Sequence, residues 1–124
     1  MIKTISLLAR RPGMTREAFI EYYEQTHAPL GTTLLEPWAT RYVRRYLSPL
    51  PSYVSGTVRE SPFDVATEVW YPDPAALVGL TNALQEPSVR SMFEADEMRL
   101  FDRARSLRFM AEERETQLQP RSTK

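Results

Sequence analysis

The order of strand-like and helix-like patterns along the chain limits the fold more than any other feature. Short β-branched or alternating segments typical of strands are interleaved with segments of helical spacing. Strands are predicted at residues 2–10, 39–47, 63–71 and 104–113, and helices at 14–27, 75–85 and 88–101. This order is that of a ferredoxin-like α+β domain whose second helix is broken in two. We therefore predict a four-stranded antiparallel sheet with helices on one face.

Residues with known positional preferences mark several of these boundaries. Thr15 and Asp73 are suited to accept hydrogen bonds from orphan amides at helix starts, and Pro74 suits a first helical position. The end of the chain is polar and carries no apolar periodicity. We predict one domain over residues 1–113 and a polar tail over residues 114–124.

The second face of the predicted sheet is too apolar to be left in water. The side chains that we assign to it are Thr4, Ser6, Tyr42, Tyr46, Ala66, Trp70 and Met110. Such patches mark an interface or a ligand site. A second copy of the same sheet could cover this face.

Charge and composition exclude several function classes. Sixteen basic residues balance sixteen acidic ones among the 124 residues, so no general field favours nucleic acid or an anionic membrane. No cysteine is present, which excludes disulfides and thiolate chemistry. The sequence has no apolar run long enough to span a bilayer, and its start lacks a signal-peptide cleavage site. We expect no nucleic-acid or membrane partner and a cytoplasmic location.

The motifs of common cofactor sites are also missing. There is no glycine-rich phosphate loop, no nucleophile elbow and no paired histidines. A single histidine cannot supply the ligand sets of common zinc sites. We therefore expect neither a metal nor a cofactor.

Four stretches in register resemble the EthD-like family of dimeric α+β barrel proteins. They read RRPGMTREAFIEYYEQTHAPL, RYV, FDVATEVWYPDPAAL and DEMRLFDRARSLRFMAEE. The resemblance covers most of residues 1–113, except the insertion at 48–62. It implies a homodimer whose sheets pack into a barrel, with a cavity between sheet and helices in each subunit. Relatives in the wider superfamily include lactone isomerases, polyketide cyclases, dehydratases and cofactor-free oxygenases, so the fold leaves the reaction open.

The family positions matched in this sequence are His27 in THAPL, Tyr42 in RYV, Glu68 in TEVW and Asp96 in DEMRLF. His27 shares a helical face with Tyr23. It is either a helix-terminal histidine stabilised by the helix dipole or a general base, because imidazole ionises near neutrality. Asp96, next to Glu97, either lies on a solvated helix face or has a functional role, in which it orients the imidazole or acts as a second acid.

The remaining candidates also have structural alternatives. A carboxylate within a strand is costly unless paired, so Glu68 either pairs with an arginine such as Arg44 or Arg108 or acts as an acid or base. Tyr42 and Tyr46 either line a half-buried sheet or donate to a developing oxyanion. Trp38 and Trp70 are core or interface anchors, or walls for an aromatic ligand together with Tyr23.

One tunable base, phenols and an aromatic-lined cavity suffice for proton abstraction next to a carbonyl. The expected function is therefore a cofactor-independent lyase, cyclase, dehydratase or isomerase acting on an aromatic or polyketide-like carbonyl compound. One alternative is a cofactor-free monooxygenase of anthrone-type substrates. Another is a non-catalytic accessory protein that binds a hydrophobic metabolite.

The segment 48–62 is longer than a hairpin needs and holds three prolines with several apolar residues. It is either a tolerated surface insertion, since added loop length costs little free energy, or a functional element. A functional loop could cover the cavity mouth or contact the partner subunit.

Overall fold

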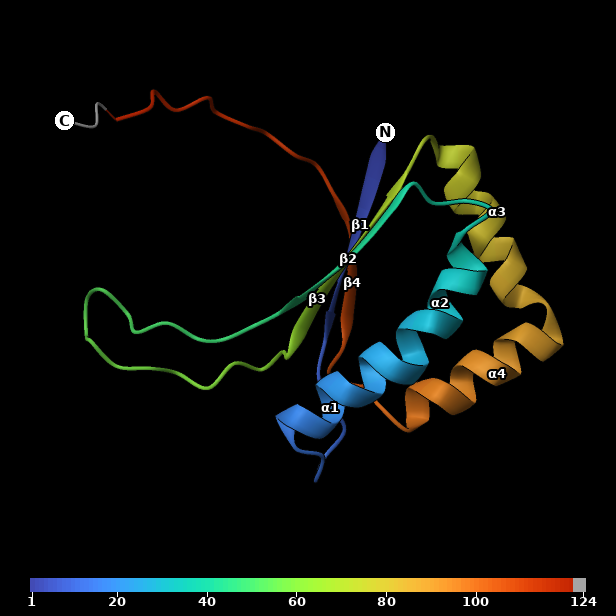
Figure 1. The fold of residues 1–124 in the computed structure, drawn as a ribbon, viewed down its shortest axis with the longest axis horizontal. Coiled ribbons are helices and arrows are strands. Elements are labelled where there is room, and N and C mark those ends of the chain that lie inside the picture. The colour runs from blue at the N-terminus through green and yellow to red at the C-terminus, as the bar shows by residue number, and fades with distance from the viewer. Residues whose placement is uncertain (122–124) are drawn as a thin grey trace.

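The computed structural model describes residues 1–121, and all its helices pack on one face of a single antiparallel sheet (Figure 1). The strands are β1 (Ile2–Leu8), β2 (Arg41–Tyr46), β3 (Val65–Tyr71) and β4 (Leu107–Ala111). Their order in the sheet is β2-β3-β1-β4, with β1 antiparallel to both of its neighbours. The predicted ferredoxin-like arrangement is confirmed. None of the helices in residues 1–121 is both long and apolar enough to cross a membrane.

The helical elements are α1 (Arg16–Tyr22), the π-helical turn η1 (Tyr23–His27), α2 (Ala28–Leu35), α3 (Pro74–Gln85) and α4 (Pro87–Met98). Both predicted caps are present. The Thr15 hydroxyl accepts from the Ala18 amide at 3.1 Å, and the Asp73 carboxylate accepts from the Ala76 amide at 2.9 Å. These bonds satisfy amides that have no partner within the first turn.

The first helix does not end at His27 as the helix-terminal interpretation requires. The π turn η1 joins α1 to α2, and the Ala28 amide bonds the Tyr23 carbonyl five residues earlier. Pro29 has no amide to donate in an α-helix, but it falls where the π turn changes the hydrogen-bond register. The chain can therefore remain helical past His27.

The strand register corrects our assignment of the second sheet face. On β3, Val65, Thr67 and Val69 face the helices and are buried, so their cross-strand neighbours face the helices too. Thr4, Ser6, Tyr42, Tyr46 and Met110 consequently lie on the helix side, while Ala66 and Trp70 lie on the open side. Period-two alternation separates the two faces of a strand, but it does not say which one meets the helices.

The open face is still partly apolar. Alternation places Ile5 and Leu7 of β1 and Val43 of β2 on this face. On the edge strand β4, Leu107 and Phe109 are 48% and 46% exposed. The subunit alone therefore leaves an apolar stripe in water beside the edge of its sheet.

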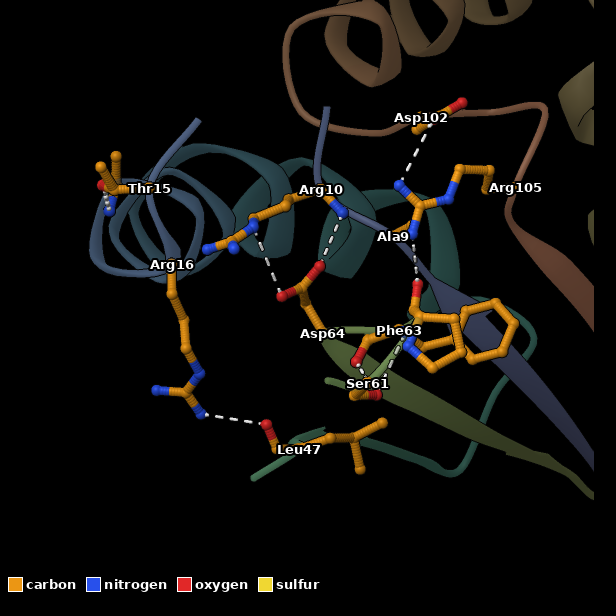
Figure 2. Close-up of polar contacts among 12 residues, drawn as sticks. Ala9, Arg10, Thr15, Arg16, Leu47, Ser61, Phe63, Asp64, Asp102 and Arg105 are labelled. Atoms are coloured by element: carbon orange, nitrogen blue, oxygen red, sulfur yellow. Dashed lines mark hydrogen bonds and ion pairs between the residues drawn. The ribbon is translucent and has the colours of Figure 1, made fainter. Parts of the chain in front are cut away.

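The 48–62 loop has fixed ends and an exposed middle, and it contains neither helix nor strand. At one end the Arg16 guanidinium donates to the Leu47 carbonyl at 3.4 Å, and at the other the Arg10 amide donates to Asp64 at 2.9 Å (Figure 2). Between these anchors, the apolar residues Leu50, Tyr53, Val54 and Val58 are exposed. The loop and the segment 112–121 extend on the side of the sheet away from the helices (Figure 1).

Candidate functional site

A cavity of about 320 Å³ lies between the helix face of the sheet and the helices. Its polar lining includes His27, Tyr42 and Glu97, which come from three different elements. Most of its wall is apolar, and the apolar side chains that form it are Leu8, Leu34, Leu35, Val69, Leu80, Leu84, Phe93 and Phe101. A concave apolar site with a few convergent polar groups is the usual form of a small-molecule site.

His27 and Asp96 form a hydrogen-bonded pair at this cavity. The His27 Nδ1 lies 2.5 Å from Asp96 Oδ2, and the Tyr22 hydroxyl donates to Asp96 Oδ1 at 2.9 Å. Asp96 is buried near the end of α4 and therefore does not belong to a solvated face. The rings of Tyr23 and Phe101 pack edge-on against the imidazole, with centroids 4.7 and 5.2 Å away. The imidazole is thus held in one orientation from several sides.

The pairing determines which imidazole nitrogen can act as a base. An ionised carboxylate only accepts hydrogen bonds, so Nδ1 must carry the proton that lies between His27 and Asp96. In neutral His27, Nε2 is then unprotonated and can take a proton. The carboxylate also stabilises the imidazolium that results. This arrangement is that of a general base held by a positioning residue.

Three hydroxyl groups extend from the cavity into the sheet. The Tyr42 hydroxyl donates to the Tyr23 hydroxyl at 3.4 Å, and the Tyr23 and Thr67 hydroxyls lie 2.5 Å apart. Burial raises the pKa of both phenols above the ordinary tyrosine value. Tyr23 and Tyr42 therefore keep their protons at neutral pH and can serve as hydrogen-bond donors.

Glu97 is a cavity residue that the sequence interpretation missed. It lies next to Asp96 but lines the cavity, and its carboxylate is 3.9 Å from the Arg103 Nε. Burial raises the pKa of the Glu97 carboxyl, and the charges of Arg103 and His27 oppose this only in part. A carboxyl with a raised pKa can hold a proton to deliver. Two adjacent acidic residues on a helix gave no sequence signal to distinguish Glu97 from a solvated side chain.

The structure does not bring Glu68 to this site. Its side chain lies on the open face of the sheet, 7% exposed, and forms ion pairs with Lys3 and Arg45. Burial opposes ionisation of Glu68, but the hydrogen bonds from Lys3 and Arg45 outweigh it and lower the pKa of the carboxyl. Of the two alternatives for Glu68, the structure shows the ion pair. The partners differ from the expected Arg44 and Arg108, because those two arginines lie on the other face.

Three predicted ligand-binding side chains also lie outside the cavity. The Tyr46 hydroxyl donates to Glu24 at 2.5 Å, and Arg44 also binds that carboxylate. Trp38 packs against Gly79 of α3, within the contact between α2 and α3. Trp70 lies on the open face between Lys3 and Arg41, whose cationic groups are 4.6 and 4.4 Å from its ring centroid. Of the four predicted ligand-binding residues, only Tyr23 lines the cavity.

Two further questions concern a metal site and the 48–62 loop. Within residues 1–121, no three His, Cys, Asp or Glu side chains are grouped closely enough to hold a metal ion. No residue of the 48–62 loop lines the cavity, so the loop does not cover the cavity of its own subunit.

The comparisons with known proteins agree with this architecture. The profile of the EthD domain family matches residues 11–104. No curated protein matches the sequence. Similar solved structures include At3g17210 from Arabidopsis thaliana, with a TM-score of 0.62 and 14% identity over 95% of this chain and 100% of that one. HapK from Hahella chejuensis has a TM-score of 0.57 and 12% identity over 97% and 99% of the two chains. A dimeric ferredoxin-like protein of unknown function from Thermobifida fusca has a TM-score of 0.55 and 13% identity over 89% and 88%.

Proposed function

The chain belongs to the EthD domain family, and from this premise and the cavity geometry we propose that it is a cofactor-independent enzyme that abstracts a proton next to a carbonyl group. The observation that carries the proposal is the His27–Asp96 pair, 2.5 Å apart at the wall of an apolar cavity. Such chemistry leads to cyclisation, loss of water or a double-bond shift. The class is therefore a lyase, cyclase or isomerase of aromatic or polyketide-like compounds.

Each step can be assigned to a group at the cavity. His27 Nε2 takes the proton from the carbon, and the electron pair of the broken C–H bond moves into the carbonyl to form an enolate. The Tyr42 hydroxyl keeps its single proton and, turning away from the Tyr23 hydroxyl, donates it in a hydrogen bond to the enolate oxygen. Asp96 holds the imidazolium. A protonated Glu97 can then give its proton to a departing hydroxyl, or His27 can return the abstracted proton to another carbon.

We also propose a homodimer that covers the open sheet face. The supports are the exposed apolar residues of β4, the resemblance to dimeric α+β barrels and the dimeric protein from Thermobifida fusca. Sedimentation at micromolar concentration tests this proposal. A stable, well-folded monomer would contradict it.

Proton abstraction can be tested before the substrate is known. In D₂O, exchange of α-hydrogens in a panel of aryl ketones and 1,3-diketones can be followed by NMR with and without protein. We expect wild-type protein to accelerate exchange for some compounds and His27→Ala to reduce that rate by about 10²- to 10⁴-fold. Gln25→Ala is the matched control, because Gln25 lies in the same π turn but is exposed.

The same samples distinguish the alternative functions. A folded His27→Ala protein that exchanges α-hydrogens as fast as wild type would contradict the base assignment. Oxygen consumption that depends on the ligand would instead indicate the monooxygenase. Tight binding of carbonyl compounds without exchange or oxygen uptake would indicate an accessory binding protein.

A further inference from the structure

Two arginines line the cavity on its β4 side, and they differ in their partners. Arg103 precedes β4 and lies 3.9 Å from the Glu97 carboxylate through its Nε. Arg108 lies within β4, and among residues 1–121 no carboxylate lies within ion-pair distance of its guanidinium. The charge of Arg108 is therefore not neutralised by a neighbouring side chain.

The strand register directs Arg108 into the cavity. It is opposite Ser6 of β1, and Ser6 lines the cavity together with Thr4 on the same strand. Tyr71 lines the same cavity, and the charge of Arg108 partly opposes the rise in the Tyr71 pKa that burial causes. Arg108 is itself exposed, so it places a solvent-accessible cation at the rim of a mostly apolar cavity.

A free guanidinium in such a place fits one ligand chemistry better than others. Its planar set of N–H donors matches the two oxygens of a carboxylate and can bind both at once. The apolar residues around the rest of the cavity match an aromatic or aliphatic body. A ligand with an apolar body and one carboxylate satisfies both parts of the site.

We propose that Arg108 binds the carboxylate of the ligand, so that the cavity selects apolar carboxylic acids over their neutral counterparts. This proposal rests on the proposed function in one respect, the substrate class. The substrate becomes a carbonyl compound that also bears a carboxylate. The Arg108 contact fixes one end of the molecule, and His27, the proposed base, lines the same cavity.

The test is calorimetric binding of a naphthalene carboxylate and of its methyl ester, in a buffer without phosphate or carboxylate ions. These probes undergo no turnover, so the result is independent of the α-hydrogen exchange assay. We expect wild-type protein to prefer the acid. Arg108→Gln should weaken binding of the acid by about 10- to 100-fold and leave binding of the ester unchanged. Arg108→Lys should retain part of the preference for the acid, because lysine keeps the positive charge but lacks the planar pair of N–H donors.

Arg105→Gln is the matched control. Arg105 is an exposed arginine three residues away that lies outside the cavity and contacts Asp102 and the Pro62 carbonyl. The Arg105→Gln substitution removes the same charge as Arg108→Gln and should leave the preference for the acid intact. Equal binding of acid and ester by wild type, no binding of the acid at millimolar concentration, or an unchanged preference in Arg108→Gln would each overturn the proposal. If wild-type protein accelerates no α-hydrogen exchange, the proposed function is overturned, but the proposed carboxylate binding by Arg108 is not.

Discussion

Two glycines in the middle of helices permit a test of the packing that builds the cavity. Gly31 lies in α2 and Gly79 in α3, and replacing either by alanine should gain up to about 1 kcal/mol of helix propensity. Their surroundings differ. A Cβ at Gly31 would lie 3.5 Å from the Tyr42 hydroxyl, an ordinary contact, whereas one at Gly79 would overlap three ring carbons of Trp38.

The two substitutions should therefore change stability in opposite directions. Overpacking typically costs about 1 to 3 kcal/mol, and the rigid indole of Trp38 cannot bend away as a flexible chain would. We expect Gly31→Ala to raise the free energy of unfolding by up to about 1 kcal/mol. Gly79→Ala should lower it by about 1 kcal/mol, which is an overpacking cost of about 2 less the propensity gain.

Urea unfolding at one fixed protein concentration measures both values, because the proposed dimer would make stability depend on concentration. A Trp38→Leu background is the control, and there the cost of Gly79→Ala should largely disappear. If Gly79→Ala stabilises the protein as much as Gly31→Ala does, the packing argument for the contact between α2 and α3 is wrong.

Other expectations concern the open face and the loop. Because the pKa of Glu68 is lowered, its ion pairs stabilise the fold above the unfolded carboxyl pKa of about 4.3, and this contribution is lost as pH falls through the lower folded value. Glu68→Gln should lower stability at pH 7 by about 2 kcal/mol and flatten the acid side of a plot of unfolding free energy against pH; an unchanged acid limb would contradict this. Replacing residues 50–59 by a short Gly-Ser turn should leave probe binding intact and shift sedimentation toward monomer. Weaker probe binding by a mutant that remains dimeric would instead support a lid over the partner's cavity.

Local patterns were sufficient to predict the four strands and the helices α1, α3 and α4, because each presents its apolar residues with its own period, but they did not predict α2. They were insufficient for the cavity. Glu68 and Trp70 lie on the same strand as Thr67 but on its other face. Which face of β3 the helices cover is decided only by the packing of the helices. The pairing of His27 with Asp96 joins residues that are far apart in sequence, so it followed from the resemblance to the EthD family and not from spacing.

The π turn explains why Tyr22 was absent from the predicted site. In an α-helix, residues five apart are about 140° from each other around the axis, so Tyr22 and His27 would point in different directions. Spacing of three and four residues therefore placed His27 on the same face as Tyr23 and not Tyr22. The wider turn η1 brings residues five apart nearer to one face, and Tyr22 and His27 bind the two oxygens of Asp96. The turn that accommodates Pro29 thus also assembles the partners of the Asp96 carboxylate, and it leaves Tyr23 to support the imidazole ring from the side.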